Sequence, residues 1–359
     1  MTACKKSGPV QQMLNIIKYL DRQIFDPYLV TLYPEPSEGS QLKNFIPYVK
    51  HHLAPESKLN LIIGRDHHLR ATLEEINPDV IHSLGVFPDF AISRMKRWRH
   101  IITLRNYVYE DYPSKYGGLR GSIMAKLHLY AMKHTTKTVT CSESLAKIYN
   151  KHLSLKYDFI RNGVDVEKYT KPPKDKKAMI RKELGLSTNA FILVYTGQMI
   201  ERKNVGFLLS SFANHFKNID VYLILLGGGN LLDSYKNQYG EIKNIDFRGN
   251  VPNVEHYLKA CDAYVSTSTS EGLPNGALEA MATGLPVVLS DIDQHKEIFS
   301  VDDNIGYCYH QGDEDDFVKG IELVMTNGEE MGNAAYVTAH QQFSANKMSA
   351  NYQELYKNL

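Results

Sequence analysis

The chain has 359 residues, of which 43% are hydrophobic and 23% are charged, and its formal net charge is +1. This length predicts two domains of roughly 100–200 residues each, and this composition excludes a disordered chain. No apolar run reaches the roughly 20 residues of a membrane-spanning helix, and we see no secretory signal. The four cysteines form no CxxC pair or close cluster, so we expect a cytoplasmic protein with reduced thiols and no zinc site.

The charge is unevenly distributed along the chain. Residues 1–165 hold 23 basic and 15 acidic side chains, whereas residues 166–359 hold 18 and 25. In the basic half, residues 94–100 mix cations with Trp98, and residues 119–136 mix cations with leucine, isoleucine and methionine. Both segments suit either a solvated helix face or the surface of an anionic membrane.

Short β-rich runs alternate with helical patterns throughout the chain. In the first half, the predicted strands are Tyr28–Leu32, Leu59–Ile63, Val80–His82, Ile101–Leu104, Thr138–Cys141 and Tyr157–Ile160. In the second half, they are Phe191–Thr196, Val221–Leu226, Ile245–Arg248, Ala263–Thr267 and Val287–Ser290. Apolar strands separated by helices indicate a parallel sheet that is covered on both faces. We therefore predict two doubly wound, Rossmann-like α/β domains that face each other across a cleft, with ligands at the carboxyl ends of the strands.

Two further patterns define the helices and the domain boundary. Residues 205–216 carry one apolar stripe, as expected of an amphipathic helix on the second sheet. Lys171–Lys177 contains two prolines followed by charged residues, which is typical of a linker. We therefore predict an N-terminal domain over residues 1–170 and a C-terminal domain over residues 171–344.

The most informative segment is STSEGLPNGALEAMATGLP, which spans Ser268–Pro286. Pro274 suits the first turn of a helix, so Glu271 lies before that helix and Glu279 lies inside it. At about 1.5 Å of rise per residue, the two carboxylates are too far apart to share one proton. We interpret them as acceptors for separate hydroxyl clusters of one elongated ligand, with an anion site between them at the helix N-terminus, near Leu273–Asn275.

A second motif follows the predicted strand Phe191–Thr196. Gly197 opens a loop that leads to Arg202 and Lys203, just before a helix and at the carboxyl end of a strand. Arginine can bind two oxygens at once and lysine acts as a point charge, so this pair suits a phosphate group. The glycine triplet at 227–229 is a weaker signal, because such triplets are more often turns than ligand sites.

The Glu271-x7-Glu279 motif resembles the signature of the family 4 retaining glycosyltransferases, which have the GT-B fold. Further segments similar to this family follow in the expected order: Thr140–Leu145, Arg161–Asp165, Gly197–Lys203, Arg248–Pro252 and Ala260–Asp262. The tail from Phe343 to Tyr356 resembles the closing helix of the family. The resemblance therefore implies that helix 345–359 packs back on the first domain.

The resemblance implies a nucleotide-diphosphate sugar as the donor. In the family, residues placed as Arg202 and Lys203 hold the diphosphate, a residue placed as Glu279 binds the ribose, and one placed as Glu271 lies at the donor sugar. We therefore expect Arg202, Lys203 and Glu271 to be catalytic. The expected donor site also includes Gly8, Gly197, Gly272, Leu273, Pro274, Asn275 and Glu279. The donor is a substrate, and we expect neither a cofactor nor a required metal ion.

The first domain resembles the family less closely. Ser7–Gln11 resembles the glycine-rich loop in which Gly8 would approach the donor phosphates, but in the family a hydrophobic strand precedes this loop. Either the start of the sequence is misassigned or trimmed, or the first strand of the domain is missing. We predict that the natural protein begins upstream of Met1.

Three residues are candidates for the acceptor side of the site. His82 ends a predicted strand, although a lone histidine is more often structural. Arg105 stands where the family often carries a histidine, so it either binds an acceptor phosphate or forms a surface ion pair. Asn162 belongs to an N-G-V-D turn, which we expect to shape the domain junction.

Three other interpretations compete with this one. A metal-dependent transferase would need a DxD motif, and Asp291–Asp293 and Asp313–Asp315 match that pattern literally. A nucleotide-sugar epimerase has a similar fold and needs no acceptor. A catalytically inactive GT-B scaffold would bind partners without turnover. The sequence contains no Walker A motif and no GxGxxG, which disfavours a kinase or a dehydrogenase.

We therefore predict a retaining hexosyltransferase that moves a sugar from a UDP-sugar, or next from a GDP-sugar, to a glycan or lipid-linked acceptor. The expected process is the synthesis of cell-surface polysaccharide such as capsule or O-antigen. The expected partners are these substrates and an anionic membrane surface, which the basic first domain contacts, and no nucleic acid. We expect a cytoplasmic protein that associates peripherally with the inner face of the plasma membrane.

Overall fold

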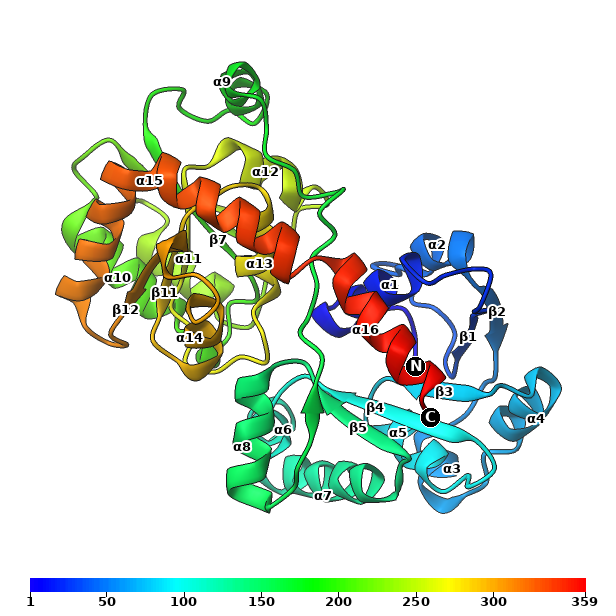
Figure 1. Ribbon diagram of the computed structural model, residues 1–359. Helices are drawn as coiled ribbons and strands as arrows, with labels where there is room; N and C mark the ends of the chain where they lie inside the picture. Colours follow the sequence, from blue (N-terminus) through cyan, green and yellow to red (C-terminus); the bar gives the residue numbers. More distant parts are fainter. The chain divides into compact units, whose positions relative to one another are not determined.

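The computed structural model describes residues 1–359, apart from the side chains of Ser114 and Lys174. It divides into two compact units, which are described separately. The first unit comprises Met1–Gly163 and Ala345–Leu359, and the second comprises Val164–Ser344. Both units contain parallel β-sheets with helices packed against them (Figure 1).

The first unit contains two parallel sheets. One sheet pairs β1 (Tyr28–Thr31) with β2 (Lys50–Leu53). The other sheet has the order β3-β4-β5-β6 and comprises Val80–Ser83, Arg99–Leu104, Lys137–Thr140 and Asp158–Phe159. Strand β4 is buried along almost its entire length and ends at Leu104, so Arg105 lies at the carboxyl edge of this sheet, where parallel sheets commonly bind ligands.

The helices of the first unit connect these strands. They are α1 (Gly8–Lys18), α2 (Leu42–Phe45), α3 (Lys58–Ile63), α4 (His67–Ile76), α5 (Val86–Ser93), α6 (Val108–Tyr116), α7 (Gly118–His134) and α8 (Glu143–Leu153), with a 3-10 turn at Ile46–Tyr48. Helix α16 (Ala345–Lys357) lies beside α1, as the red and blue helices of Figure 1 show. Met348 and Tyr352 of α16 share a buried cluster with Met13 and Ile16 of α1.

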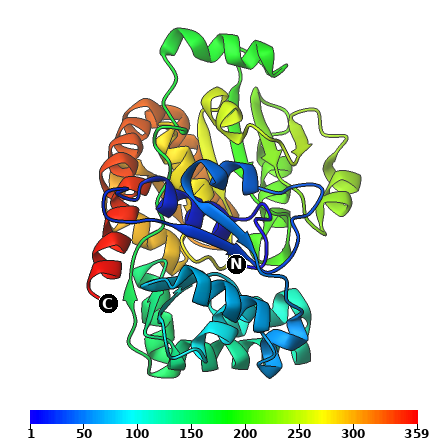
Figure 2. The same cartoon turned by 90° about the vertical axis from the view of Figure 1, so that its right-hand side faces the viewer.

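The segment before α1 runs along strand β1 without being a strand itself. The amino group of Met1 donates to the carbonyl of Val30 at 3.0 Å. The amide of Leu32 donates to the carbonyl of Met1 at 3.1 Å. Figure 2 shows the N-terminus in this part of the first unit. Among the described residues α1 is the first regular element, and a missing first strand stays a prediction.

The second unit contains one six-stranded parallel sheet of order β12-β11-β10-β7-β8-β9. In chain order the strands are β7 (Phe191–Thr196), β8 (Val221–Leu226), β9 (Ile245–Gly249), β10 (Ala263–Ser266), β11 (Val287–Ser290) and β12 (Gly306–Tyr309). Strand β10 pairs with β7 although they are not consecutive in the chain, so the order of connection reverses between these two strands. Such a reversal marks the position where doubly wound sheets bind ligands.

The helices of the second unit cover this sheet. They are α9 (Lys174–Glu183), α10 (Val205–His215), α11 (Leu232–Tyr239), α12 (Val254–Ala260), α13 (Asn275–Ala282), α14 (Asp293–Phe299) and α15 (Glu314–Gln342). Two 3-10 turns, η2 (Glu201–Lys203) and η3 (Asp303–Ile305), complete the unit. Helix α9 lies beside α12 at the edge of the unit (Figures 1 and 2).

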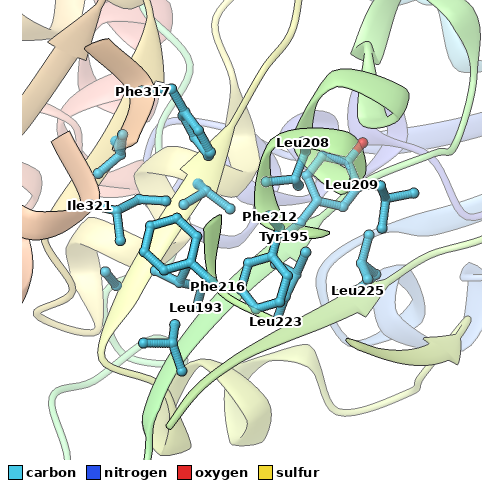
Figure 3. Packing of buried hydrophobic residues seen from close by; sticks show 14 of the residues in the cluster. Leu193, Tyr195, Leu208, Leu209, Phe212, Phe216, Leu223, Leu225, Phe317 and Ile321 are labelled. Carbon is cyan, nitrogen blue, oxygen red and sulfur yellow. The ribbon is translucent and has the colours of Figure 1, made fainter. Parts of the chain in front are cut away.

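The core of the second unit lies between the sheet and helices α10 and α15. Figure 3 shows Leu193 and Leu223 of the strands facing Phe212 of α10 and Phe317 of α15. The predicted apolar stripe is confirmed: Val205, Leu208, Leu209, Phe212 and Phe216 are all buried in this cluster. Full burial of each such side chain contributes about 1.5–3 kcal/mol, so α10 is held firmly behind the loop that precedes it.

The strand predictions from apolar runs are mostly confirmed, with one wrong assignment and two omissions. Leu59–Ile63 is part of helix α3 instead of a strand. The hydroxyl of Ser57 caps that helix by accepting from the amide of Asn60, and Gly64 ends it in the left-handed conformation. Strands β2 and β12 were not predicted, because β2 has the polar sequence KHHL and β12 begins with Gly306.

The chain passes from the first unit to the second at Gly163–Val164, before the linker that the sequence suggests. Lys171 donates to the side chain of Asn333 in α15, and α9 begins at Lys174. The segment 171–177 therefore lies within the second unit. Among the described residues, no helix is both long enough and apolar enough to cross a membrane.

Candidate active site

The loop after β7 is shaped by a close approach of two glycine turns. The amide of Gly197 donates to the carbonyl of Leu226, and the amide of Met199 donates to the carbonyl of Gly228. A Cβ atom on Gly227 would lie 1.8 Å from the carbonyl oxygen of Gly197. The glycine triplet therefore serves as a turn that lets the Gly197 loop pack against it, which explains why these positions need glycine.

Arg202 and Lys203 lie in the 3-10 turn η2, at the end of this loop. Asn204 closes the turn in the left-handed conformation, with φ of 48°, and α10 follows at once. Thr267 supports the turn from the end of β10, because its hydroxyl donates to the carbonyl of Lys203 at 3.1 Å. The two cations are thus fixed at the carboxyl ends of β7 and β10.

The carboxylate of Glu271 forms ion pairs with both Arg202 and Lys203. Arg202 Nη1 donates to Glu271 Oε2 at 3.1 Å and to the carbonyl of Ser270 at 3.0 Å. Lys203 Nζ donates to Glu271 Oε1. The Glu271 side chain is only 7% exposed, whereas those of Arg202 and Lys203 are 22% and 17% exposed. The structure therefore brings the three predicted catalytic residues together.

Three further side chains hold Glu271 in place. Ser268 Oγ donates to Glu271 Oε1 at 2.7 Å, and Ser290 Oγ donates to the carbonyl of Ser268 at 2.6 Å. His295 Nδ1 donates a hydrogen bond to the carbonyl of Ser290 at 2.8 Å. All three side chains are buried, and this series of hydrogen bonds links β11 and α14 to the carboxylate of Glu271.

The electrostatics of the cluster favour a bound anion. Burial would raise the pKa of Glu271, but Lys203 and Arg202 together lower it to about 2. Burial lowers the pKa of Lys203, and Glu271 opposes that shift. Burial also lowers the pKa of His295 to about 4, so this ring is neutral at pH 7. Two cations thus share one carboxylate, and the cluster has a net positive charge.

Glu279 lies inside α13, as predicted, and contacts a different side chain. Tyr169 is buried and forms a hydrogen bond with Glu279. Burial raises the pKa of Tyr169 well above its usual value, and the charge of Glu279 adds to that shift. The tyrosine hydroxyl therefore stays protonated, donates to Glu279 and orients that carboxylate.

The turn before α13 packs closely against the strand ends. Gly272, Leu273 and Pro274 are buried, and Asn275 begins the helix. A Cβ atom on Gly276 would lie 2.5 Å from the hydroxyl of Thr196, so glycine lets the helix N-terminus approach β7. An anion site at this helix N-terminus stays a prediction.

The first unit contains the remaining predicted site residues. Arg105 Nη1 donates to Asn162 Oδ1 at 2.7 Å, so two of the three acceptor-side candidates are in contact. His82 is bound within the unit, with Nδ1 2.8 Å from the hydroxyl of Tyr356 and Nε2 2.9 Å from that of Thr103. These two bonds tie His82 to α16 and to β4, and its role on the acceptor side stays a prediction. Gly8 lies at the start of α1, where Ser7 caps the helix.

The first carboxylate of each DxD pattern has local partners. Asp291 accepts from the amide of Gln311 at 3.0 Å and pairs with Lys296 at 3.1 Å. Asp313 caps α15 by accepting from the amide of Asp316. Within the described part of the chain, no group of three or more metal-binding side chains is placed to hold an ion. Metal independence stays a prediction.

Sequence reasoning did not find Tyr169, Ser290 or His295. Tyr169 lies four residues after the N-G-V-D turn. A buried tyrosine hydroxyl usually has a hydrogen-bond partner, and here that partner is Glu279. Ser290 and His295 lie after the motif, and only the pairing of β10 with β11 brings them to Ser268. Ser268 is the first residue of the segment Ser268–Pro286, but its contact with the carboxylate is evident only from the structure.

Comparisons with known proteins cover both units. Residues 6–168 match the family described as Glycosyltransferase Family 4, and residues 176–340 match Glycosyl transferases group 1. A UDP-Gal:α-D-GlcNAc-diphosphoundecaprenol α-1,3-galactosyltransferase of Escherichia coli is 25% identical over 334 residues, which are 89% of this chain and 78% of that protein. The O-antigen biosynthesis glycosyltransferase WclY of E. coli is 24% identical over 292 residues, with 78% and 79% covered.

Solved structures give the same fold. HepE of Anabaena in complex with UDP-glucose superposes with a TM-score of 0.80 and 17% identity, over 100% of this chain and 98% of that one. Two glycosyltransferase families thus match consecutive parts of the sequence, and the cation cluster lies in the part that matches group 1. The chain therefore belongs to the GT-B glycosyltransferases and is an enzyme that transfers sugars.

Proposed function

We propose that this enzyme transfers a hexose from a nucleotide-diphosphate sugar to a lipid-linked glycan acceptor, with retention of the anomeric configuration. The observation that carries the proposal is the cluster in which Arg202 and Lys203 share the buried carboxylate of Glu271. Its net positive charge suits a diphosphate, and it lies where doubly wound sheets bind ligands.

The cluster suits the difficult step of the reaction. When the bond from the anomeric carbon to the diphosphate breaks, negative charge builds up on the leaving oxygen. Arg202 and Lys203 are already oriented by Glu271, so they would stabilise that charge without reorganising. Loss of one such preorganised group typically lowers kcat by about 10²–10³.

The state of Glu271 supports a mechanism without a protein nucleophile. Its pKa of about 2 makes it a weak base, and Lys203, Arg202 and Ser268 already occupy its oxygens. A carboxylate held in this way is a poor nucleophile towards the sugar. We therefore propose that the acceptor hydroxyl attacks from the face that the diphosphate leaves, which retains the configuration.

Other residues of the second unit would contact the ribose and the diphosphate of the donor. We propose that Glu279, held by Tyr169, accepts from the ribose hydroxyls, and that Gly197 and the turn before α13 line the diphosphate. UDP is favoured, with GDP next, because one relative is named for UDP-Gal and HepE was solved with UDP-glucose. We also propose that no metal ion is required.

The acceptor proposal is supported by a relative and by a surface of the first unit. The galactosyltransferase relative is named for a diphosphoundecaprenol-linked acceptor. Helix α7 exposes Leu119 and Ile123, which are 79% and 52% exposed, next to the cations Arg120 and Lys126. Such a face suits the surface of an anionic membrane. We propose peripheral attachment there and a role in O-antigen or related polysaccharide synthesis.

Vesicle sedimentation tests the membrane proposal. The protein should bind vesicles that contain anionic lipid at low salt and detach as salt rises, because charge is screened within about 8–10 Å at 0.1–0.15 M. Replacing Leu119 and Ile123 by serine should weaken binding, and Val337→Ser, an exposed position on α15, should not. Absence of binding at low salt would contradict the proposal.

Product analysis tests the transfer reaction. The protein is incubated with UDP-sugars and an α-GlcNAc-diphosphoalkyl acceptor, with and without EDTA, and the linkage is read by NMR. We expect an α-linked product in both conditions and none with Lys203→Ala. A β-linked product would contradict retention, loss of activity with EDTA would contradict metal independence, and free sugar without an acceptor product would favour an epimerase or hydrolase.

A further inference from the structure

The guanidinium of Arg105 is a cation whose hydrogen-bonding capacity the protein leaves largely unused. Arg105 directly follows β4, and Nη1 donates to Asn162 Oδ1 at 2.7 Å. Its Nε and Nη2 atoms are buried and have no hydrogen-bond partner among the described residues. A guanidinium carries five N–H donors, so a single neutral acceptor leaves most of them unsatisfied.

The ring and hydroxyl groups beside Arg105 are neutral, although the carboxylate of Asp89 also acts on His82. The nearby groups are His82, Tyr352 and Tyr356, which join Thr103 in one hydrogen-bonded chain. Burial, reinforced by the charge of Arg105, lowers the pKa of His82 to about 3, so the ring is neutral. Burial raises the pKa values of both tyrosines, so their hydroxyls are neutral as well. Among the described residues, the side-chain partner of Arg105 is the neutral amide of Asn162.

A comparison within the chain shows that this arrangement is unusual. Arg181 is also buried, but it donates to the carbonyls of Ala260, Thr188 and Ala190 and to the carboxylate of Asp262. The buried N–H groups of Arg181 are therefore satisfied within the protein, whereas the buried Nε and Nη2 of Arg105 are not. The residue itself remains partly exposed, at the carboxyl edge of a parallel sheet.

From these observations we infer that Arg105, oriented by Asn162, is an anion-binding residue of the first unit that takes a phosphate group of a substrate. The inference rests on the proposed function, which supplies two phosphate sources: the diphosphate of a lipid-linked acceptor and that of the nucleotide-sugar donor. A guanidinium fork can bind two phosphate oxygens at once, and Nε and Nη2 form one such fork.

Titration with sodium pyrophosphate at constant ionic strength tests the site. The measurement starts from Lys203→Ala, which disables the cluster in the second unit. In that background Arg105→Met should weaken pyrophosphate binding about tenfold or more, because hydrogen bonds to charged groups are strong. Arg65→Met, an exposed arginine in the loop before α4, is the matched control and should change nothing. Equal affinity with and without Arg105→Met would overturn the inference. Should the methionine variant fail to fold, Arg105→Gln takes its place with the same expectation.

Two probes identify the source of the phosphate, with Lys203 intact. Weaker binding of decyl phosphate by Arg105→Met, measured below its micelle concentration, assigns the site to the acceptor lipid. Weaker binding of UDP assigns it to the donor, and no change in either overturns the inference. A separate measurement tests the proposed function alone: the wild-type protein should bind UDP, and Lys203→Ala should abolish that binding. The proposed function and the role of Arg105 can therefore fail separately.

Discussion

Lys203 and Glu271 form an ion pair that is largely shielded from water, with side chains 17% and 7% exposed. Lys203 comes from the turn after β7, and Glu271 comes from the loop after β10. The pair therefore connects the two strands between which the sheet changes its order of connection. Arg202 shares the same carboxylate, so a change at Glu271 affects two cations at once.

Glu271→Ala should destabilise the protein strongly, because it leaves two cations without their carboxylate. Loss of one partner of a buried pair typically costs about 3–5 kcal/mol of unfolding free energy, measured by urea denaturation. The matched control is Asp26→Ala, which removes the exposed Lys50–Asp26 pair, whose side chains are 60% and 64% exposed. That change should have little effect on the unfolding free energy. Similar losses in both variants would contradict the picture of a buried cluster.

The stability of the protein should fall as the pH drops from 7 to 5. Burial lowers the pKa values of His100 and His295 to about 4, whereas their unfolded value is near 6.5. Between these values the unfolded chain binds more protons, so protonation favours unfolding. Protonation linked to each of these histidines should make the unfolding free energy about 2 kcal/mol lower at pH 5 than at pH 7. Urea titrations at several pH values measure this loss, and His295→Gln should reduce the slope. A stability that is constant over this range would contradict the neutral, buried state of these rings.

Glu271 should add a separate loss of stability at lower pH. Its folded pKa of about 2 lies below its usual value of 4.5. The stabilisation is therefore fully present above pH 4.5 and is lost as the pH falls from 4.5 towards 2. In Glu271→Gln the dependence in this lower window should be weaker, while the histidine-dependent loss above pH 4.5 should remain. If the loss of stability between pH 4.5 and 2 is the same in this variant as in the wild type, other carboxylates cause it.

The apolar runs predicted most strands because both faces of these sheets are covered. Strands β7 and β8 lie where the runs Phe191–Thr196 and Val221–Leu226 placed them. The run at 59–63 was wrong because a short apolar stretch suits a buried strand and a short helix equally. Only the cap at Ser57 and the left-handed Gly64 distinguish the two. Strand β2 was missed because its half-exposed KHHL sequence has no apolar signal.

The residues in contiguous motifs could be predicted, and their supporting contacts could not. Arg202, Lys203 and Glu271 stand in two recognisable motifs, and the structure joins them. His295 and Ser290 reach the cluster through the pairing of β10 with β11, which is a tertiary contact. The contact of Arg105 with Asn162 likewise joins residues that lie on different strand ends, 57 positions apart.

Gly227→Ala should disrupt the loop that presents Arg202 and Lys203. A Cβ at this position would lie 1.8 Å from the carbonyl oxygen of Gly197, so the loop or the turn must move. We expect a loss of about 3 kcal/mol or more in unfolding free energy. Gly312→Ala is the control, because Gly312 also has a positive φ but has open space around it, and should cost about 1–2 kcal/mol. Equal costs would show that backbone conformation alone requires glycine at position 227.

Tyr169→Phe should weaken donor binding without abolishing catalysis. The change removes the hydroxyl that orients Glu279 and leaves the buried ring in place. We expect the Kd for the nucleotide to rise about 3–10-fold, because one hydrogen bond to a charged group is lost. Calorimetric titration with UDP measures this, together with kcat at saturating donor, which should change little. A lower kcat with an unchanged Kd would contradict a role at the ribose.

The central claim is that the Arg202–Lys203–Glu271 cluster binds the diphosphate of a nucleotide-sugar donor. A thermal-shift screen of UDP, GDP and ADP and their common sugars, with wild type and Lys203→Ala, tests it most directly. A ligand at 100 times its Kd stabilises the fold by about 2.7 kcal/mol, which such a screen detects. We predict that UDP and a UDP-sugar stabilise the wild-type protein and that Lys203→Ala loses this effect. Stabilisation that persists in Lys203→Ala, or the absence of a shift with every nucleotide, would contradict the claim.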